Sequence, residues 1–464
     1  MYGRTHRIHL IGIGGSGMSG IAEVLLTMGY QVSGSDLRGS EVTDRLVRLG
    51  GRVCIGHNAA NVEGAQVVVY STAVHEDNPE MISARAAGIP VIGRAEMLAE
   101  LMRMKYGIAV GGSHGKTTTT SMVAAVLARG GLDPTIVVGG RLHALGTNAR
   151  LGHGPFLVAE ADESDGSFLR LSPAVAVITN IDREHLDHYA DLDAIRQAFV
   201  YFANRVPFYG VTVVCADDPP VRDILPRVTK RTVLYGTRPE CDVRAAGIEL
   251  KPHGSRFMVH AFGRERGPIE LQLPGRHNVL NALAAAAVGL EIEIGFGQIA
   301  EALAGFRGVG RRFETRGEAG GVRVVDDYGH HPTEILATLA AARGLGGRVL
   351  VVFQPHRYTR TAALAAEFGA AFGDADAVWV LDIYAAGESP IAGVTGASIA
   401  ESAHRQGAQH VRFAPDADAA VAEVAQQAQS GDVVLTLGAG DVWRLGDQVL
   451  DRLRGSAVAA GARR

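Results

Sequence analysis

Short apolar runs recur along the chain, and most of them stop at a loop rich in glycine or in charged residues. Arg7–Ile11, Tyr106–Val110 and Val322–Val325 are typical. Runs of this length beside glycine-containing turns favour buried strands, and the sequence that follows each of them suits a helix. Strands that alternate with helices through short links favour parallel sheets, so the pattern predicts an α/β fold.

Polar side chains gather directly after the ends of the predicted strands. This is the edge of an open parallel sheet at which ligands bind. The chain has 464 residues, and a prior of roughly 150 residues per domain predicts about three domains. We place them at residues 1–106, 107–313 and 314–464, each with a strand that runs into a loop of this kind.

The first such loop, Gly12–Gly17, has the spacing G-x-G-x-x-G between a predicted strand and a predicted helix. Asp36 follows about twenty residues later, as in dinucleotide-binding domains. The same loop can hold any diphosphate, and Asp36 can accept a hydrogen bond from a ribose or a base. A dinucleotide and a UDP-linked substrate therefore remain equally open at this point.

The second loop joins Tyr106–Val110 to a helix predicted over Lys116–Arg129. Its glycines let backbone N–H groups face an anion at the helix N-terminus. Lys116 can reach the β- and γ-phosphates of a nucleotide, and the hydroxyl of Thr117 can bind Mg²⁺. Val110 stands where the full phosphate-loop pattern has glycine, so the match is to a shortened form. A glycine turn before a threonine-rich helix is the alternative.

Acidic residues follow the next predicted strand, at Glu160–Asp165. A carboxylate beside a phosphate loop is placed to bind Mg²⁺, although a solvated acidic turn has the same composition. His185 and His188 lie just after a further apolar run. Either can bind metal or substrate or simply face solvent, and we favour His185.

Asn278 and Asn281 open a predicted alanine-rich helix and lie on one of its faces. Their amides can read the edge of adenine or cap the helix, and the residues alone do not separate the two roles. In the third segment, His330, Arg357 and Arg360 suit the binding of a carboxylate and the acceptance of a proton. Together these parts fit ATP-driven activation of a carboxylate to an acyl phosphate, followed by attack of an amine.

Composition narrows the class of protein. A net charge of −4 argues against a nucleic-acid-binding surface. The three cysteines, Cys54, Cys215 and Cys241, are odd in number and far apart, which indicates neither disulfides nor a zinc cluster and fits a reducing cytoplasm. The run from Ile8 to Ala22 contains five glycines, so it suits a strand and loop better than a signal peptide, and no other stretch predicts a membrane span.

Seven motifs, taken in order, give a resemblance that covers nearly the whole chain. The sequence resembles the Mur ligases at Ile11–Gly20, Gly112–Thr118, Glu160–Asp165, His277–Asn281, Gly310–Phe313, Asp326–Pro332 and Gln354–Arg360. The resemblance implies a Rossmann-like N-terminal domain that binds UDP, a central ATPase domain of the P-loop type and a mobile, Rossmann-like C-terminal domain. It favours UDP over NAD at the first loop.

The resemblance also implies roles for individual residues. The UDP-linked substrate would contact Gly14, Gly15, Ser16, Gly17, Asp36, Ser71 and Arg94. ATP would contact Gly112, Ser113, His114, Gly115, Lys116, Thr117, Thr118, Asn278, Asn281, Arg312 and Asp327. Thr117 and Glu160 would bind the metal, and His185 would support a second metal near the acyl phosphate. L-alanine would be held by Tyr328, His330, Arg357 and Arg360. Lys116, Arg312 and His330 would be the catalytic residues.

The activity that the resemblance implies is an ATP- and Mg²⁺-dependent ligase that joins L-alanine to UDP-N-acetylmuramate in peptidoglycan synthesis. We expect a cytoplasmic monomer or weak homodimer with no nucleic-acid or membrane partner. A ligase that adds a tripeptide to the same UDP substrate is the nearest alternative. An NAD-dependent oxidoreductase and a non-catalytic nucleotide sensor are more distant ones.

One departure from the wider family concerns lysine. Several sister ligases orient Mg²⁺ with a carbamylated lysine, but this chain has no lysine between Lys116 and Lys230. We therefore predict that the central domain carries no carbamylated residue and that another group, such as His185 or a carboxylate, takes that role.

Overall fold

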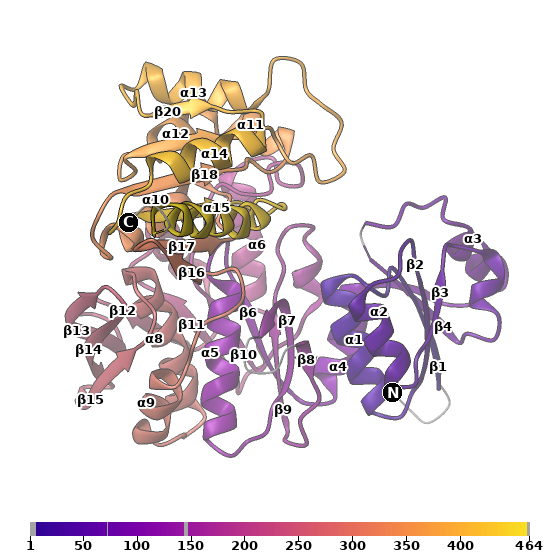
Figure 1. The fold of residues 1–464 in the computed structure, drawn as a ribbon. Helices are drawn as coiled ribbons and strands as arrows, with labels where there is room; N and C mark the ends of the chain where they lie inside the picture. The colour runs from indigo at the N-terminus through magenta and orange to yellow at the C-terminus, as the bar shows by residue number, and fades with distance from the viewer. Residues whose placement is uncertain (1–5, 72, 143–146, 462–464) are drawn as a thin grey trace.

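The computed structural model describes residues 6–71, 73–142 and 147–461 of the chain. Three α/β units follow one another, and each is built around a sheet of its own (Figure 1). The N-terminal and C-terminal units both lie against the central one. The predicted fold class, three α/β domains, is confirmed. No helix within the described residues is both long enough and apolar enough to cross a bilayer.

The N-terminal sheet has five parallel strands in the order β3-β2-β1-β4-β5. Its strands are β1 (Arg7–Ile11), β2 (Gln31–Asp36), β3 (Arg52–Ile55), β4 (Val67–Tyr70) and β5 (Val91–Gly93). Its helices are α1 (Ser16–Thr27), α2 (Glu41–Arg48), α3 (Pro79–Ala86) and α4 (Arg94–Arg103). The strand order reverses beside β1, so the glycine loop that follows β1 lies at the crevice where such sheets bind ligands.

The central sheet has ten strands in the order β15-β14-β13-β12-β11-β10-β6-β9-β7-β8. Its first strands are β6 (Tyr106–Gly111), β7 (Thr135–Leu142), β8 (Thr147–Arg150), β9 (Phe156–Glu160) and β10 (Val175–Ile178). They are followed by β11 (Val211–Cys215), β12 (Thr232–Gly236), β13 (Val243–Lys251), β14 (Gly254–Ala261) and β15 (Arg264–Leu271). The middle of the sheet is parallel, and an antiparallel pair or meander forms each edge.

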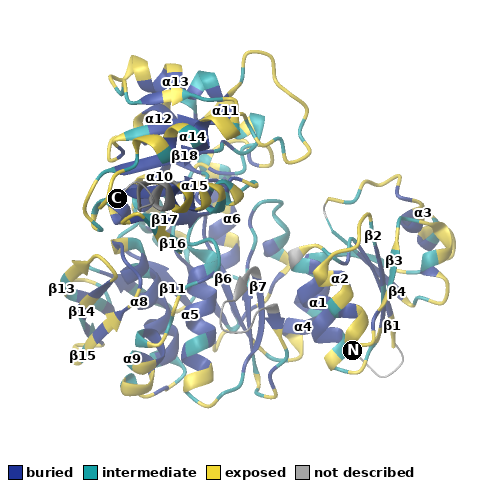
Figure 2. Ribbon diagram, viewed as in Figure 1, coloured by how far each residue is buried: buried dark blue, intermediate teal, exposed yellow. Residues whose placement is uncertain are grey.

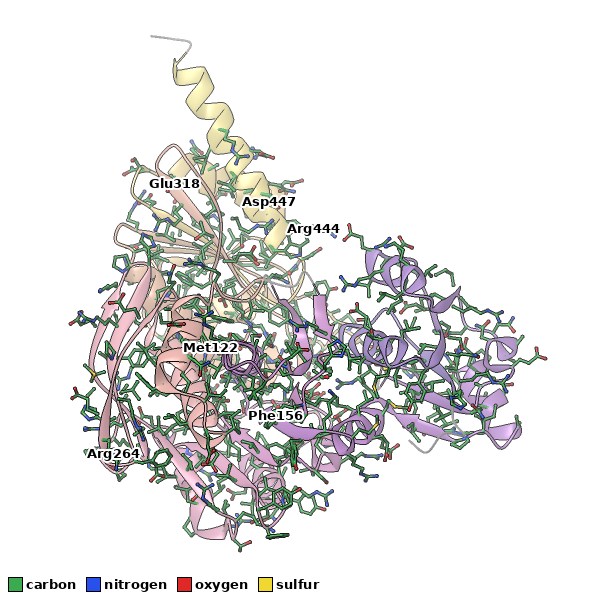
Figure 3. All side chains as sticks on the ribbon, turned by 90° about the horizontal axis from the view of Figure 1, so that it is seen from below. Met122, Phe156, Arg264, Glu318, Arg444 and Asp447 are labelled. Carbon is green, nitrogen blue, oxygen red and sulfur yellow. The ribbon has the colours of Figure 1, made fainter. Side chains whose placement is uncertain are left out.

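Helices cover the central sheet on both faces. They are α5 (Lys116–Arg129), α6 (Leu192–Ala203), α7 (Pro219–Ile224), α8 (Arg276–Glu291) and α9 (Phe296–Ala304). The alanines of α8 from Ala282 to Ala287 are fully buried, and α8 packs closely against α5 because small side chains let the two backbones approach. Figure 2 shows α5 buried along most of its length. In Figure 3, Met122 of α5 lies in the interior, whereas Arg264 lies at the outer end of the meander.

The C-terminal sheet has six strands in the order β16-β17-β21-β18-β19-β20, and only β16 is antiparallel to its neighbour. The strands are β16 (Glu314–Ala319), β17 (Val322–Asp327), β18 (Val349–Phe353), β19 (Ala377–Val380), β20 (Val411–Phe413) and β21 (Val433–Leu437). The helices are α10 (Pro332–Arg343), α11 (Tyr358–Ala363), α12 (Ala365–Ala370), α13 (Gly396–Arg405), α14 (Ala417–Gln427) and α15 (Trp443–Gly461). Arg444 and Asp447 lie near the start of α15, which extends outward from this domain (Figure 3).

Candidate functional site

The phosphate loop follows β6, and two glycines decide its shape. Gly112 has φ +135°, and a Cβ there would lie 2.0 Å from Oγ1 of Thr179. Gly115 has φ +78°, and a Cβ there would lie 2.7 Å from Oδ1 of Asn281. Both positions therefore require glycine, and α5 begins at the next residue, Lys116, as predicted. The loop opens the positive end of α5 toward a cavity.

Lys116 is held within this loop. Its Nζ donates to the carbonyls of Gly112 at 2.7 Å and Ser113 at 3.1 Å, and to Oε1 of Glu163 at 2.8 Å. Burial alone would lower the pKa of Lys116, but the carboxylate of Glu163 raises it above the usual lysine value. The side chain is therefore a fixed cation at the phosphate loop.

Carboxylates and one histidine gather beside Lys116. Glu163, Glu184 and His185 each bring a ligand atom within 4.8 Å of the others. Oε2 of Glu163 is buried and has no hydrogen-bond partner among the residues that the structure describes. Thr117 and Glu160 line the same cavity as His185. The three predicted metal ligands therefore share one cavity, and Glu163 is an additional candidate that approaches His185 to 3.4 Å.

Another cavity, of about 440 Å³, lies between the phosphate loop, α8 and the start of the C-terminal domain. Asn278 and Asn281 are buried on its wall, where Nδ2 of Asn281 donates to Oδ1 of Asn278 at 3.3 Å. The N-cap of α8 is Gly275, so the capping interpretation of the two asparagines is wrong. Arg312 and Asp327 line the same cavity, as do three residues of the loop and α5, His114, Gly115 and Thr118.

Asp327 and Arg312 connect this cavity to the C-terminal domain. The carboxylate of Asp327 accepts hydrogen bonds from the backbone N–H groups of Phe313 and Gly329, both at 2.7 Å. Burial nevertheless raises the pKa of Asp327 to about 6, although Arg312 opposes the change. Arg312 lines both this cavity and the one that holds Thr117, Glu160 and His185.

The cavity that holds Thr117, Glu160 and His185 has a volume of about 820 Å³ and lies where the C-terminal domain faces the phosphate loop. Its walls hold Ser113, Gly115, Lys116, Thr117, Glu160, His185, Arg312, Tyr328, His330, Arg357 and Arg360. The residues predicted for the metal and L-alanine thus meet in one space with the predicted ATP contacts Ser113, Gly115, Lys116, Thr117 and Arg312, whereas His114, Thr118, Asn278, Asn281 and Asp327 line the cavity of about 440 Å³. They come from segments that are far apart in the sequence.

Two arginines on the C-terminal side of this cavity contact carboxylates of the central domain. Nη2 of Arg360 lies 3.1 Å from Oε1 of Glu184, and the two side chains are only 9% and 6% exposed. Nη1 of Arg357 lies 3.0 Å from Oδ2 of the more exposed Asp187. Arg357 has a positive φ of +71°, which costs energy for a residue with a side chain. Both guanidinium groups already bind carboxylates, which is the chemistry that an amino-acid substrate requires.

His330 follows β17 in the same cavity. Its Nδ1 lies 3.0 Å from the carbonyl oxygen of Tyr328, and its ring packs edge-on against the ring of His356 at 5.4 Å. Burial and the nearby Arg360 lower the pKa of His330 to about 4. The imidazole is therefore neutral at neutral pH and can accept a hydrogen bond from a substrate amine.

A cavity of about 300 Å³ lies between the N-terminal and central domains. Gly15, Gly17, Ser71 and Arg94 line it, and Glu160 of the central domain lines its far side. Nη2 of Arg94 donates to Oδ2 of Asp162 at 3.2 Å. The loop after β1 therefore opens toward the phosphate-loop domain.

The other residues predicted for the first loop lie beside this cavity. Oδ2 of Asp36 accepts the N–H of Gly14 at 2.8 Å and so fixes the loop against β2. Ser16 is the first residue of α1, and its side chain lies outside the described part of the structure. Asp36 thus supports the loop whether or not it also touches a ligand.

Three family models match consecutive parts of the chain. They are described as the Mur ligase family catalytic domain at residues 7–106, the Mur ligase middle domain at 110–289 and the Mur ligase glutamate ligase domain at 311–440. Together they span most of the sequence. The chain belongs to the Mur ligase family.

Relatives within the Mur ligase family match over the full length. The UDP-N-acetylmuramate–L-alanine ligases of Geobacter sp. strain M21 and Geobacter sulfurreducens are 58% and 56% identical. Each alignment covers 98% of this chain and 99% of the relative. Among solved structures, the UDP-N-acetylmuramate–alanine ligase of Thermotoga maritima is 31% identical with a TM-score of 0.79, covering 97% of this chain and 99% of the other.

A murein peptide ligase from Psychrobacter arcticus shares the fold. It is 23% identical with a TM-score of 0.71, over 97% of this chain and 99% of the other. At this identity the likeness concerns the Mur ligase fold and no finer property.

Two carboxylates in this Mur ligase site were missed by the sequence analysis. Glu184 precedes the predicted ligand His185, and Glu334 lies in the first turn of α10, where it forms a capping box with His331. Both are largely buried and both face histidines and arginines. The order of Pro332 and Glu334 in the sequence is a recognisable helix start, but it does not reveal that Glu334 faces another domain.

Proposed function

We propose that the chain is an ATP-dependent ligase that joins L-alanine to the carboxylate of UDP-N-acetylmuramate, releasing ADP and phosphate, in the synthesis of peptidoglycan precursors. Full-length relatives at 54–58% identity carry this activity in their names. One observation in the structure carries the proposal. Lys116 of the phosphate loop and the arginines Arg357 and Arg360 line the same cavity of about 820 Å³.

The three domains would divide the work. Residues 1–106 would bind the UDP-linked substrate at the loop after β1, with Gly15, Gly17, Ser71 and Arg94 on the cavity wall. Residues 107–313 would bind ATP, and residues 314–464 would bind L-alanine. The cavity of the N-terminal domain includes Glu160, which also lines the phosphate-loop cavity, so the sugar carboxylate has a short path to the γ-phosphate.

ATP would lie across the two cavities beside the phosphate loop. Asn278 and Asn281 would face the adenine, Asp327 the ribose, and Lys116 and Arg312 the phosphates. Arg312 lines both cavities, which suits contact with phosphates near their boundary. The residue types match the needs of the ligand, since amides can read a base edge and guanidinium and ammonium groups bind phosphate.

The residues beside Lys116 fit Mg²⁺. Oε2 of Glu163 is buried and accepts no hydrogen bond from any described residue. Nε2 of His185 lies 3.4 Å from the other oxygen, Oε1. Carboxylate and hydroxyl oxygens are the ligands that Mg²⁺ prefers. We assign Thr117, Glu160, Glu163 and His185 as the residues that would hold it. Mg²⁺ would neutralise negative charge on the phosphates during transfer.

The reaction has two steps. A carboxylate oxygen of the muramic acid attacks the γ-phosphorus of ATP, the bond to the bridging oxygen breaks, and ADP leaves with that electron pair. The amine of L-alanine then attacks the acyl carbon, and phosphate leaves. Lys116 and Arg312 stabilise charge in the first step, and the pair Arg357 and Arg360 binds the alanine carboxylate so that the amine faces the acyl group.

The amine must lose a proton before it can attack. The imidazole of His330 lines the cavity with the two arginines, and its lowered pKa keeps it neutral. We propose that His330 assists the loss of that proton at its Nε2, because Nδ1 faces the carbonyl oxygen of Tyr328. The reaction needs ATP, so we expect it in the cytoplasm.

The alternative addition of a tripeptide is not favoured. The full-length relatives are named for L-alanine. The NAD-dependent oxidoreductase and the nucleotide sensor leave the meeting of the phosphate loop with Arg357 and Arg360 unexplained.

Phosphate release from ATP, measured with Mg²⁺ and UDP-N-acetylmuramate in the presence and absence of L-alanine, tests the proposal. We expect release that requires both substrates, is lost in Lys116→Ala, and is retained in Lys251→Ala, whose side chain is exposed on β13. ATP consumption that ignores L-alanine would overturn the acceptor assignment, and replacing L-alanine with the tripeptide would then test the alternative.

A further inference from the structure

We propose that His114 and Glu334 are positioning residues that join the phosphate loop to the amino-acid pocket across the boundary between the central and C-terminal domains. The inference rests on the proposed function, because it assigns ATP to the first site and L-alanine to the second. It concerns side chains whose roles the proposed reaction leaves open.

His114 lies in the middle of the phosphate loop and is fixed at its backbone. Its N–H donates to Oδ1 of Asn180 at 2.7 Å, and its carbonyl accepts from Oγ1 of Thr179 at 2.7 Å and from Nδ2 of Asn180 at 3.0 Å. The side chain is only 12% exposed. Its position therefore changes only if the phosphate loop changes with it.

The imidazole of His114 bridges two domains. Nε2 lies 2.9 Å from Oδ2 of Asp182 in the central domain, and Nδ1 lies 3.5 Å from Oε1 of Glu334 in the C-terminal domain. Nδ1 is buried and forms no hydrogen bond to any described residue, so its contact with Glu334 is an ion pair. A pair of this kind can be made or broken by a small movement of one domain.

Glu334 holds the other end of the link. Oε2 accepts the N–H groups of His330 at 2.9 Å and His331 at 3.3 Å, which fixes this oxygen to the start of α10. Oε1 faces the central domain, where it approaches His114 and, at 3.5 Å, Nη1 of Arg312. The same carboxylate thus touches the phosphate loop, the proposed phosphate ligand Arg312 and the backbone of the proposed proton acceptor.

The charges around the two residues are complementary. His114 faces the carboxylates Asp182, Glu184 and Glu334. Burial alone would lower the pKa of His114, but these carboxylates raise it to about 10, so the group is a cation at neutral pH. Glu334 in turn faces His330, His114 and Arg312.

A bound metal explains this cluster less well. His114, Asp182 and His331 lie close enough to hold an ion, but both nitrogens of the His331 ring are already engaged. Nδ1 accepts the N–H of Thr333 at 3.3 Å, and Nε2 lies 3.2 Å from the carbonyl oxygen of Arg183. These contacts leave no free ligand position on His331.

The boundary also holds a second buried ion pair, between Arg360 and Glu184, and a pair that is much more exposed. Arg183 pairs with Glu367 at 2.9 Å, with side chains 50% and 42% exposed. Such a pair contributes little, whereas the nearly buried pair of His114 and Glu334 is screened less by solvent. Because Glu334 accepts the backbone N–H of His330, a movement of Glu334 toward the phosphate loop would move His330 as well. Binding of ATP at the phosphate loop would therefore order the pocket for L-alanine.

Steady-state kinetics of His114→Gln, Glu334→Gln and the double variant in the full-length enzyme test the link. We expect each single variant to lower kcat/KM for L-alanine by about tenfold or more, mainly through KM. The double variant should be no worse than the more damaging single one, because both remove the same contact. Glu367→Gln, which removes the exposed pair, is the matched control and should behave as the wild type.

The outcomes are separable. If the wild type shows no phosphate release that depends on L-alanine, the proposed function fails. If the wild type is active and the effects of the two single variants multiply in the double variant, or Glu334→Gln resembles Glu367→Gln, the link is overturned. Thermal unfolding of each variant shows whether a loss of activity reflects a loss of fold, and in that case Glu334→Asp, which keeps the charge but shortens the reach, must still raise KM for L-alanine.

Discussion

Nζ of Lys116 lies 2.8 Å from Oε1 of Glu163, and both side chains are largely buried. The pair joins the phosphate loop to the acidic loop that follows β9. Removing one partner of a buried ion pair strongly destabilises the folded state, because it leaves an uncompensated charge. Glu163 therefore supports Lys116 in addition to its proposed contact with Mg²⁺.

We predict that Glu163→Gln lowers kcat at least tenfold and raises the Mg²⁺ concentration needed for half-maximal activity. It should also destabilise the fold by about 3 kcal/mol, because the buried ammonium of Lys116 would lose the carboxylate that balances its charge. Titration of activity with Mg²⁺ and denaturant unfolding measure the two effects. Asp165→Asn, in the same acidic loop but outside the large cavity, is the control, and an equal loss in both variants would contradict the prediction.

Gly112 gives a steric prediction. A Cβ at this position would lie 2.0 Å from Oγ1 of Thr179, at a φ of +135° that side chains rarely adopt. Gly112→Ala should therefore abolish ATP binding, as measured by calorimetry. Gly297→Ala in α9 meets no atom within 4 Å and should keep ATP binding while stabilising the protein by up to about 1 kcal/mol.

Much of the fold could be predicted from local sequence. The sequence predicts the helix Lys116–Arg129 with the bounds that the structure shows, because Gly115 and Gly130 lie directly before and after it. The strand β1 also has the bounds of its apolar run, Arg7–Ile11. The sequence does not predict the antiparallel pairing of β7 and β8, because a pair at the edge of a sheet depends on the strand that it joins more than on its own pattern.

The site was predictable in its residue types but not in its pairings. Lys116 and Arg360 follow from motifs, yet nothing in the sequence shows that Glu184 lies between His185 and Arg360. Nor does the sequence show that Glu334 lies 3.5 Å from His114. The contacts Glu184–Arg360 and Glu334–His114 join segments that are far apart in the chain, and the docking of one domain on another creates them.

Arg360 gives a prediction about substrate binding. Its guanidinium is 9% exposed and already holds Glu184 at 3.1 Å, so a planar fork is needed to bind the alanine carboxylate as well. Arg360→Lys should raise KM for L-alanine at least tenfold and change KM for ATP by less than threefold. The control Arg343→Lys replaces an exposed arginine of α10 that pairs with Asp376. A rise in both KM values would contradict the assignment.

The absence of a carbamylated residue can be tested directly. The chain has no lysine between Lys116 and Lys230, and Lys116 already donates to three oxygens. We predict that protein prepared in ¹³C-bicarbonate shows no carbamate signal by NMR and that removal of carbon dioxide leaves activity unchanged. A carbamate signal, or activity restored by bicarbonate, would refute the prediction.

Glu80 provides a prediction on stability that is independent of the reaction. Its carboxylate is fully buried in the N-terminal domain, where it accepts hydrogen bonds from Ser35 at 2.6 Å and Asn61 at 2.5 Å and lies 3.4 Å from His9. Burial alone would raise the pKa of Glu80, but these partners lower it from 4.5 to about 2.

The lowered pKa favours the folded state wherever the unfolded carboxyl is ionised. The contribution, on the order of 3 kcal/mol, is therefore present above about pH 4.5 and is lost as the pH falls toward 2. Glu80→Gln should destabilise the protein at pH 7 and should lose less further stability than the wild type between pH 6 and pH 3. Denaturant unfolding at a series of pH values measures this, with the exposed Glu63→Gln as the control. Parallel curves for the wild type and Glu80→Gln would show that the buried charge contributes nothing to the pH dependence.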